Sequence, residues 1–170
     1  EADVRAALVE GAEIGVVNGP RSVVISGLEP AVLAVAEGFA RRGVKTTRLA
    51  VSLGSHSACM EPIVPALGEV ARRTTVQEAQ IRVLATGGTP AAFGTPEYWT
   101  GQIRGTVRFG DAVQKAFEAG FTKYVEIGPT AVLSGLVGQT LEVGEPVLAP
   151  TVGAEGDELE PREVVFAEPV

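Results

Sequence analysis

The sequence predicts a mixed α/β protein built from two modules, and three observations support this prediction. Hydrophobic residues make up 45% of the 170 residues and charged residues 21%, a composition typical of a globular chain. Residues 1–51 read as helix, strand, strand, helix and strand, whereas residues 52–152 read as helices separated by single strands. The last segment, 153–170, turns acidic and polar and predicts a linker or tail.

The first module has a ferredoxin-like pattern. A short helix over 2–10 precedes two β-branched runs around an Asn-Gly-Pro-Arg turn at 18–21, where Asn and Gly tolerate positive φ. A helix over 29–43 with Pro near its start and Gly at its end is followed by an alternating strand over 44–52. This order is the βαββαβ unit without its first strand, which would lie before Glu1.

The second module has the pattern of α/β layering. After His56, a helix with Ile63, Leu67 and Val70 on one face is expected, and then a buried strand over 81–88. Asp111 is expected to cap a later helix. The remaining elements, in order, are a short helix within 96–109, a strand over 123–129, a helix around 133–140 and a strand over 145–150.

Composition excludes several classes of function. The formal charge of −7 and the scattered Lys and Arg residues disfavour nucleic acid as a partner. One His and one Cys cannot form a metal-ligand cluster, and the lone Cys59 excludes an internal disulfide and indicates a reducing, cytoplasmic setting. No apolar run is long enough to span a membrane. The chain begins without Met and directly on a helical pattern, which indicates a piece excised from a longer protein.

His56 is the first candidate for chemistry, because it lies between a strand and a helix, where catalytic groups of α/β folds often lie. Two readings stay open from the residues alone: a catalytic base, or a histidine whose ring satisfies loop carbonyls. No G-x-S-x-G nucleophile elbow occurs in the chain, so a catalytic His56 needs a partner elsewhere. Cys59 could be a nucleophile, but a core thiol is the favoured reading.

Six sequence segments, taken together and in this order, are a specific signal of one protein family, although each segment alone is weak evidence. They fall near the spacing of the C-terminal part of the acyltransferase domain of modular type I polyketide synthases, which this chain resembles over residues 1–152. The malonyl-CoA:acyl carrier protein transacylase of fatty-acid synthesis is similar. The segments are "VNGPRSVVISG" (17–27), "SHSACMEP" (55–62), "YW" (98–99), "RGTVRF" (104–109), "YVEIGPTAVLSGLV" (124–137) and "EPVLAP" (145–150).

The resemblance implies a fold and a reaction. Residues 52–152 would be the C-terminal part of an α/β-hydrolase-like subdomain into which the ferredoxin-like one is inserted. The family moves a malonyl-type extender unit from coenzyme A to a serine, and then to the phosphopantetheine of an acyl carrier protein. His56 matches the base that takes the serine proton. No cofactor is expected to bind this chain; coenzyme A thioester, carrier protein and neighbouring synthase domains are the expected partners.

The family residues that lie upstream are not in this chain. They are the nucleophilic Ser of G-H-S-x-G, the Arg that pairs with the malonyl carboxylate and the oxyanion-hole Gln. The fragment alone is therefore expected to be inactive. The alternative is a non-catalytic acyltransferase-like module that docks a carrier protein or a neighbouring domain.

Two further assignments follow from the resemblance. The family's specificity stretch, commonly HAFH for malonyl and YASH for methylmalonyl, reads Leu53, Gly54, Ser55 and His56 here. The Ser-His ending is of the methylmalonyl type, while Leu and Gly would widen the pocket for a branched or larger unit; Leu53 could equally be end-of-strand core. Arg108 is expected to orient the imidazole through its backbone carbonyl, with an exposed helix-start arginine as the alternative.

Overall fold

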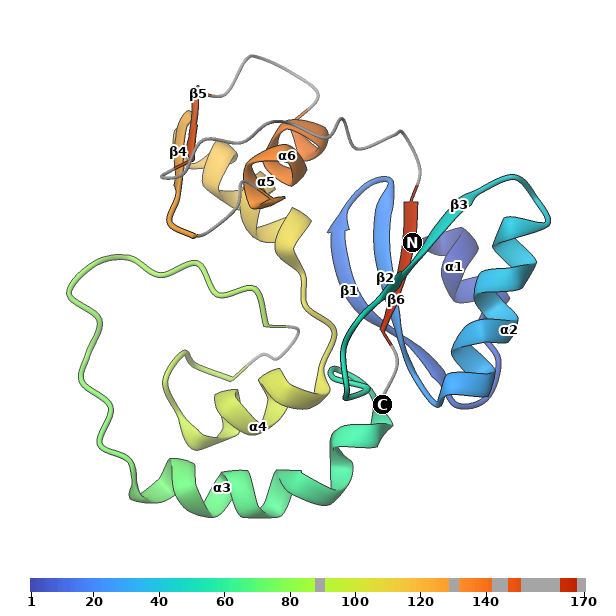
Figure 1. The fold of residues 1–170 in the computed structure, drawn as a ribbon. Helices are drawn as coiled ribbons and strands as arrows, with labels where there is room; N and C mark the ends of the chain where they lie inside the picture. Colours follow the sequence, from blue (N-terminus) through green and yellow to red (C-terminus); the bar gives the residue numbers. More distant parts are fainter. Residues whose placement is uncertain (88–90, 129–131, 142–146, 151–162, 168–170) are drawn as a thin grey trace.

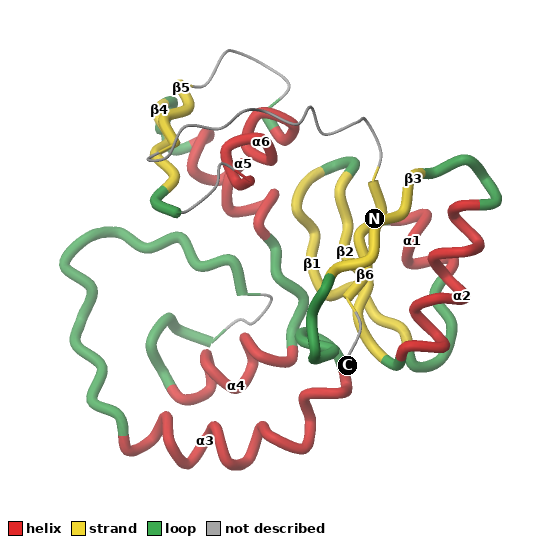
Figure 2. Tube along the Cα trace, in the orientation of Figure 1, coloured by secondary structure: helices red, strands yellow, loops and turns green. Residues whose placement is uncertain are grey.

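The computed structural model describes residues 1–87, 91–128, 132–141, 147–150 and 163–167. The N-terminal residues form a sheet with helices on one side, and the middle of the chain forms a separate, mainly helical half beside the sheet (Figure 1). Figure 2 shows that long loops, drawn in green, connect the helices of this second half. The chain is thus a mixed helix-and-strand protein, as predicted.

A four-stranded sheet forms the first half. Two helices, α1 (Ala2–Ala7) and α2 (Glu29–Ala40), lie along one face of it (Figure 1). Ile25 and Val32, from the sheet and from α2, are completely buried between them, so the core is aliphatic as the composition predicted. The strands, in spatial order, are β1 (Ala12–Gly19), β2 (Ser22–Gly27), β6 (Glu163–Ala167) and β3 (Lys45–Leu49).

The predicted hairpin is present, but its turn differs from the prediction. β1 and β2 are antiparallel, and Gly19 pairs with Ser22, so only Pro20 and Arg21 lie between the strands. Neither Asn18 nor Gly19 has a positive φ. The prediction of a turn based on their tolerance for positive φ is wrong, because β1 continues through both residues with an irregularity between Val17 and Gly19.

The tail contributes a strand that the sequence analysis missed. β6 pairs in parallel with β2 on one side and with β3 on the other. Residues 163–167 therefore belong to the sheet rather than to the predicted linker or tail, and residues 153–162 and 168–170 lie outside the described residues. The predicted order of helix, strand, strand, helix and strand over residues 1–51 is confirmed by α1, β1, β2, α2 and β3.

The second half contains short helices and a small sheet. The strands β4 (Lys123–Glu126) and β5 (Val147–Pro150) pair in parallel. Tyr98 and Trp99, expected to be scaffold, pack edge-on with ring centroids 5.1 Å apart. The helices are the 3₁₀ helix η1 (Ala58–Ile63), α3 (Val64–Arg73), α4 (Pro96–Arg104), α5 (Phe109–Glu118) and α6 (Val132–Thr140).

The buried face of α3 differs from the predicted one. Ile63 and Val70 are exposed, whereas Gly68 and Ala71 are buried. A Cβ added at Gly68 would lie 3.4 Å from Cγ2 of Thr100 on α4. The two helices approach closely at small residues, so residue size rather than hydrophobicity selects the face in contact.

Two other local predictions are also wrong. The segment predicted as a buried strand over 81–88 is not a strand over its described residues 81–87, where Gly87 makes only an isolated bridge with Val107. Ile81 is 79% exposed, because no described strand runs beside it. Asp111 does not cap α5, which begins at Phe109; its carboxylate instead accepts hydrogen bonds from the guanidinium of Arg108.

The segment after α4 joins the two halves at the edge of the sheet. Val107 donates its backbone N–H to the carbonyl of Gly15 at 2.8 Å, and its own carbonyl accepts from the N–H of Val17 at 2.8 Å. These bonds place the segment parallel to β1, next to its free edge. The second half is therefore fixed to the sheet through its backbone.

Gly27 closes the opposite end of the hairpin with a φ of 145°, a value that side chains disfavour. A Cβ at Gly27 would collide with the backbone carbonyl oxygen of Gly11. That oxygen accepts the N–H of Leu28 at 2.8 Å. The close approach of two backbone segments therefore requires glycine here.

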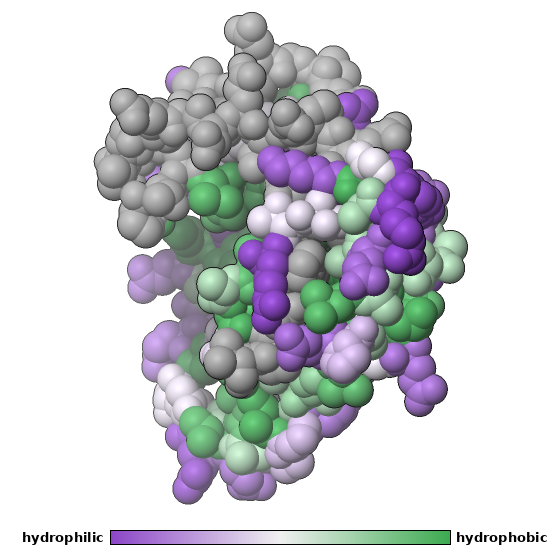
Figure 3. Space-filling model, turned by 45° about the vertical axis from the view of Figure 1, so that its right-hand side comes forward, coloured by the Kyte–Doolittle hydropathy of each residue, from purple (hydrophilic) through white to green (hydrophobic). Residues whose placement is uncertain are grey.

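The surface on the α2 side is mixed in character. Figure 3 brings this side forward and shows hydrophilic and hydrophobic residues interspersed over it. Among the described residues, no helix has both the length and the hydropathy to cross a bilayer.

Candidate active site

His56 lies in the loop between β3 and η1 and is half-buried. Its φ is 60°, in the left-handed region, a conformation that costs a non-glycine residue roughly 1–3 kcal/mol. The backbone N–H of His56 donates to the carbonyl of Ile103 at 3.2 Å. A Cβ at Gly15 would lie 3.7 Å from the Cβ of His56, so the histidine rests on β1 where a glycine leaves room for it.

The imidazole ring is held at one nitrogen by two backbone oxygens. Nδ1 of His56 lies 2.9 Å from the carbonyl oxygen of Gln102 and 3.0 Å from that of Gly105. Carbonyl oxygens only accept hydrogen bonds, so Nδ1 must carry the proton. In the neutral ring the lone pair is then on Nε2, which is the nitrogen left to act as a base.

These carbonyls belong to the C-terminal end of α4. The last carbonyls of a helix have no partner within the helix and must find donors elsewhere. His56 supplies two such donors, its backbone N–H to Ile103 and its ring N–H to Gln102. Because one residue caps the helix end with both groups, the loop position and the ring orientation are fixed together.

The structure corrects the prediction for Arg108. The carbonyls that orient the ring are those of Gln102 and Gly105, whereas the carbonyl of Arg108 accepts the N–H of Ala112 inside α5. The Arg108 guanidinium bonds to Glu1 and Asp111. The carboxylate of Glu1 has a lowered pKa because it accepts hydrogen bonds from Arg108 and Arg5. Arg108 thus ties α1 to the start of α5.

The residues after His56 form a rigid turn into η1. The Ser57 hydroxyl is buried, donates to the carbonyl of Gly54 at 2.6 Å and accepts from the N–H of Cys59. This hydroxyl is therefore the N-cap of η1. Cys59 is half-buried, and its Sγ would lie 3.0 Å from a Cβ at Gly54, so the thiol packs against that glycine.

The three residues before His56 differ in burial. Leu53 is 56% exposed, which rules out the alternative that it is end-of-strand core. Gly54 is buried, and a Cβ there would lie 3.1 Å from the carbonyl oxygen of Gly27. Ser55 is half-buried. Leu53 therefore has the most exposed side chain in this stretch.

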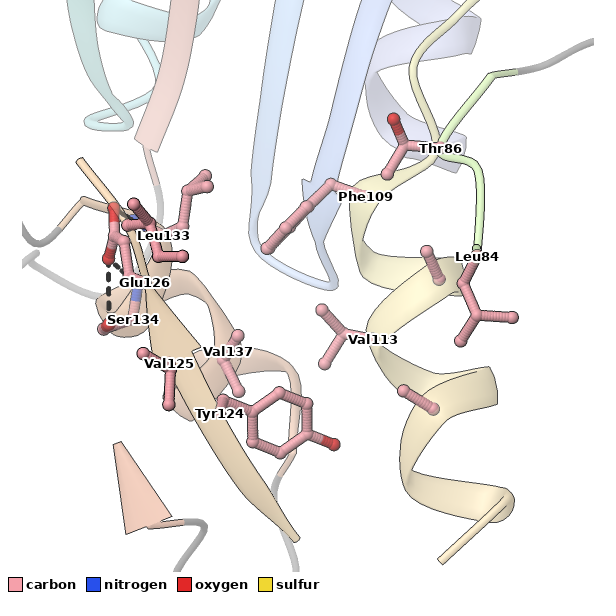
Figure 4. Close-up of a pocket in the computed structure, with 13 residues that line it drawn as sticks. Leu84, Thr86, Phe109, Val113, Tyr124, Val125, Glu126, Leu133, Ser134 and Val137 are labelled. Atoms are coloured by element: carbon pink, nitrogen blue, oxygen red, sulfur yellow. Dashed lines mark hydrogen bonds between the residues drawn. The ribbon is translucent and has the colours of Figure 1, made fainter. Parts of the chain in front are cut away.

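A cavity of about 310 Å³ lies elsewhere in the second half, between α5, β4 and α6. Figure 4 shows Phe109 and Val113 on α5 across from Val137, with Tyr124 beside them. The lining is mostly apolar and does not include His56. Among the described residues, no group of three His, Cys, Asp or Glu side chains could hold a metal ion.

The charged residue of this cavity is already bonded. The carboxylate of Glu126 accepts from the backbone N–H groups of Leu133 and Ser134 at 3.0 and 2.7 Å, and from the Ser134 hydroxyl at 2.8 Å (Figure 4). Desolvation raises the pKa of Glu126, but these hydrogen bonds outweigh it and the pKa is lowered. Glu126 therefore stabilises the start of α6.

The sequence singles out His56 as a candidate but does not indicate the groups that contact its ring. Gln102 and Gly105 act through backbone oxygens, which every residue carries, so their identity gives no signal. The one feature that could have indicated these partners is the end of the helix at Arg104, because the last carbonyls of a helix have no partner within the helix.

Comparison with known proteins gives consistent matches over nearly the whole chain. A family model described as "Acyl transferase domain" matches residues 2–163. Phenolphthiocerol synthesis polyketide synthase type I Pks15/1 of Mycobacterium marinum is 37% identical over 164 residues, which cover 94% of this chain and 8% of that protein. Polyketide synthase GfsA of Streptomyces halstedii is 43% identical over 172 residues, which cover 94% of this chain and 2% of that protein.

A solved structure matches the fold as well. The acyltransferase domain from the second module of the salinomycin polyketide synthase superposes with a TM-score of 0.81 at 36% identity. The match covers 93% of this chain and 38% of that domain. The chain spans less than a tenth of the curated synthases and well under half of the solved domain.

Proposed function

Because this chain belongs to the acyl transferase domain family, we propose that it supplies the histidine base of a Ser–His acyltransferase of a polyketide synthase. The reaction proposed is the transfer of a malonyl-type extender unit from coenzyme A to an acyl carrier protein. The observation that carries the proposal is the pair of carbonyls on Nδ1 of His56, which leaves Nε2 as the proton acceptor.

The proton steps follow from that tautomer. Nε2 of His56 takes the proton of the serine hydroxyl as the serine oxygen attacks the thioester carbon. The protonated ring then gives this proton to the departing coenzyme A thiolate, leaving an acyl-serine. In the second half-reaction, Nε2 takes the proton of the carrier's phosphopantetheine thiol, and the ring returns it to the serine oxygen as the acyl group leaves. The carbonyls of Gln102 and Gly105 face the ring throughout, so it stays oriented while charged.

The nucleophilic serine is proposed to lie in a part of the domain that this chain does not span. Ile127 is 89% exposed and Ile81 is 79% exposed, and both lie within segments predicted from sequence to be strands. Contiguous apolar surfaces usually mark interfaces, and we propose that these two side chains belong to a surface that the rest of the domain covers. We assign residues 1–51 to a ferredoxin-like subdomain and 52–152 to the C-terminal part of an α/β-hydrolase-like one.

The test is acyl loading. A complete acyltransferase domain that contains this chain after a G-H-S-x-G segment should form a serine ester with radiolabelled malonyl- or methylmalonyl-CoA and pass the label to a carrier protein. The 170-residue chain alone should take up no label, because it contains no nucleophile elbow. Label on Cys59 or on a serine of the chain alone would contradict the proposal. A complete domain that binds the carrier but never loads would show a docking module instead.

Leu53 is proposed to help select the extender unit. Replacing Leu53 by Tyr should shift the preference about tenfold toward the smaller of two competing units, because one methylene in a pocket is worth roughly 1–3 kcal/mol. The assay is competition between methylmalonyl-CoA and a longer alkylmalonyl-CoA in the complete domain. Val70→Tyr is the matched control, since Val70 is 54% exposed and lies on α3. An unchanged product ratio in Leu53→Tyr would remove this role.

A further inference from the structure

Arg104 connects elements that lie on both sides of His56. It is the last residue of α4 and lies between Gln102 and Gly105, whose carbonyls hold the ring. Its Nη1 donates to Oε2 of Glu13 at 2.8 Å, and its Nε donates to Oε1 of Glu61 at 2.7 Å. A single guanidinium thus binds carboxylates from β1 and from η1.

Glu13 extends this network to the histidine loop itself. Its second oxygen, Oε1, accepts the backbone N–H of Ala58 at 2.7 Å. Ala58 follows His56 by two residues, and Glu61 lies on the same helix that begins there. One carboxylate therefore holds the segment after the histidine while it also holds the arginine that lies between the two orienting residues.

The connectivity sets these ion pairs apart from the local pairs within single helices. Arg72 bonds to Glu69 and Arg41 to Glu37, each within a single turn of one helix. Such local, exposed pairs contribute little to stability. The bonds of Arg104 instead join β1, η1 and α4, and its guanidinium binds the two carboxylates through different nitrogens, Nη1 and Nε.

We infer that Arg104 is a positioning residue for His56, which fixes the α4 carbonyls relative to the imidazole through its bonds to Glu13 and Glu61. This inference rests on the proposed function for the part that concerns catalysis. Without the guanidinium, the end of α4 and the start of η1 would each keep their local structure but lose their shared anchor. A displacement of these carbonyls by less than an ångström would weaken the hydrogen bonds that they accept from Nδ1–H, and these hydrogen bonds select the Nδ1–H tautomer.

The chain offers a direct spectroscopic test, because His56 is its only histidine. In the 170-residue chain labelled with ¹⁵N-histidine, the two ring nitrogen signals of the neutral ring should report a single Nδ1–H tautomer. Arg104→Met should shift these signals toward the mixed tautomers of free imidazole, while Arg72→Met, the matched control, should leave them unchanged. Glu13→Gln keeps an oxygen that can accept the Ala58 N–H, so it should give an intermediate shift of the ring signals. It replaces Arg104→Met as the test variant if Arg104→Met does not fold.

Activity then separates this inference from the proposed function. In the complete domain, Arg104→Met should lower kcat about ten- to a hundredfold with little change in KM, because small misplacements of a catalytic group can cost that much. Arg104→Lys should restore part of the loss. Unchanged ring signals in both Arg104→Met and Glu13→Gln would overturn the inference. Shifted signals with undiminished kcat would leave the positioning intact and instead contradict the role of His56 as the base.

Discussion

Replacing His56 by Ala in a complete domain should lower acyl transfer by about 10²–10⁴-fold, the usual contribution of a positioned general base. Both half-reactions should slow, because in the proposed mechanism the same Nε2 accepts the proton of the serine hydroxyl and that of the phosphopantetheine thiol. The measurement is the rate of transfer of labelled extender unit to the carrier protein, with the amount of acyl-enzyme followed in parallel.

The control substitution must be a residue that can adopt the positive φ of position 56. His56 has a φ of 60°, which Asn tolerates better than Ala. The amide N–H of Asn can also donate to the carbonyls at the end of α4, but Asn cannot accept the serine proton. His56→Asn should therefore melt close to the parent and still lose transfer. Full activity in His56→Asn, or loss of folding without loss of per-molecule activity in His56→Ala, would refute the assignment.

Replacing Gly27 by Ala should be among the most destabilising substitutions in the chain, costing about 4 kcal/mol from strained φ together with overpacking. The added Cβ would meet the carbonyl oxygen of Gly11, which is backbone and cannot rotate away. The same change would disturb the hairpin end that carries the N–H of Leu28. For a domain with a typical stability of about 5–15 kcal/mol, this is a large share.

The measurement is urea unfolding of the chain, followed by circular dichroism. Gly38→Ala is the matched control, because Gly38 lies within α2 and a Cβ there would meet nothing within 4 Å. It should stabilise the protein by about 0.5–1 kcal/mol, since alanine favours helix over glycine. Equal urea midpoints for Gly27→Ala and the parent would show that the hairpin end can relax, and would contradict the requirement for glycine opposite the Gly11 carbonyl.

The order of the elements in the first half was predictable from sequence because each is defined by local patterns. Pro30 and Gly43 bound α2, and alternating β-branched runs predict β1 and β2. β6 was missed because its five residues lie in a stretch whose acidic composition hides them, and because its partners, β2 and β3, lie far away in the sequence. The segment 81–86 was wrongly predicted as a buried strand because its hydrophobic pattern does not show whether a neighbouring strand is present to pair with it.

The site was predictable only in part for similar reasons. His56 was found through its rarity and its position between a strand and a helix. The partners of its ring could not be read from residue types, because they are backbone oxygens at the end of α4. The expectation for Arg108 followed a motif, whereas the structure uses that side chain to bind Glu1 and Asp111.

The backbone bonds between Val107 and β1 have a consequence for how this region moves. The carbonyl of Gly105, which faces the imidazole, lies two residues from Val107, whose backbone forms an isolated bridge with β1 at the edge of the sheet. Because these bonds and the end of α4 lie two residues apart, we expect both to open together as one cooperative unit. We therefore expect the His56 ring to keep its orientation toward the carbonyls of Gln102 and Gly105 for as long as the β1–β2 hairpin stays folded.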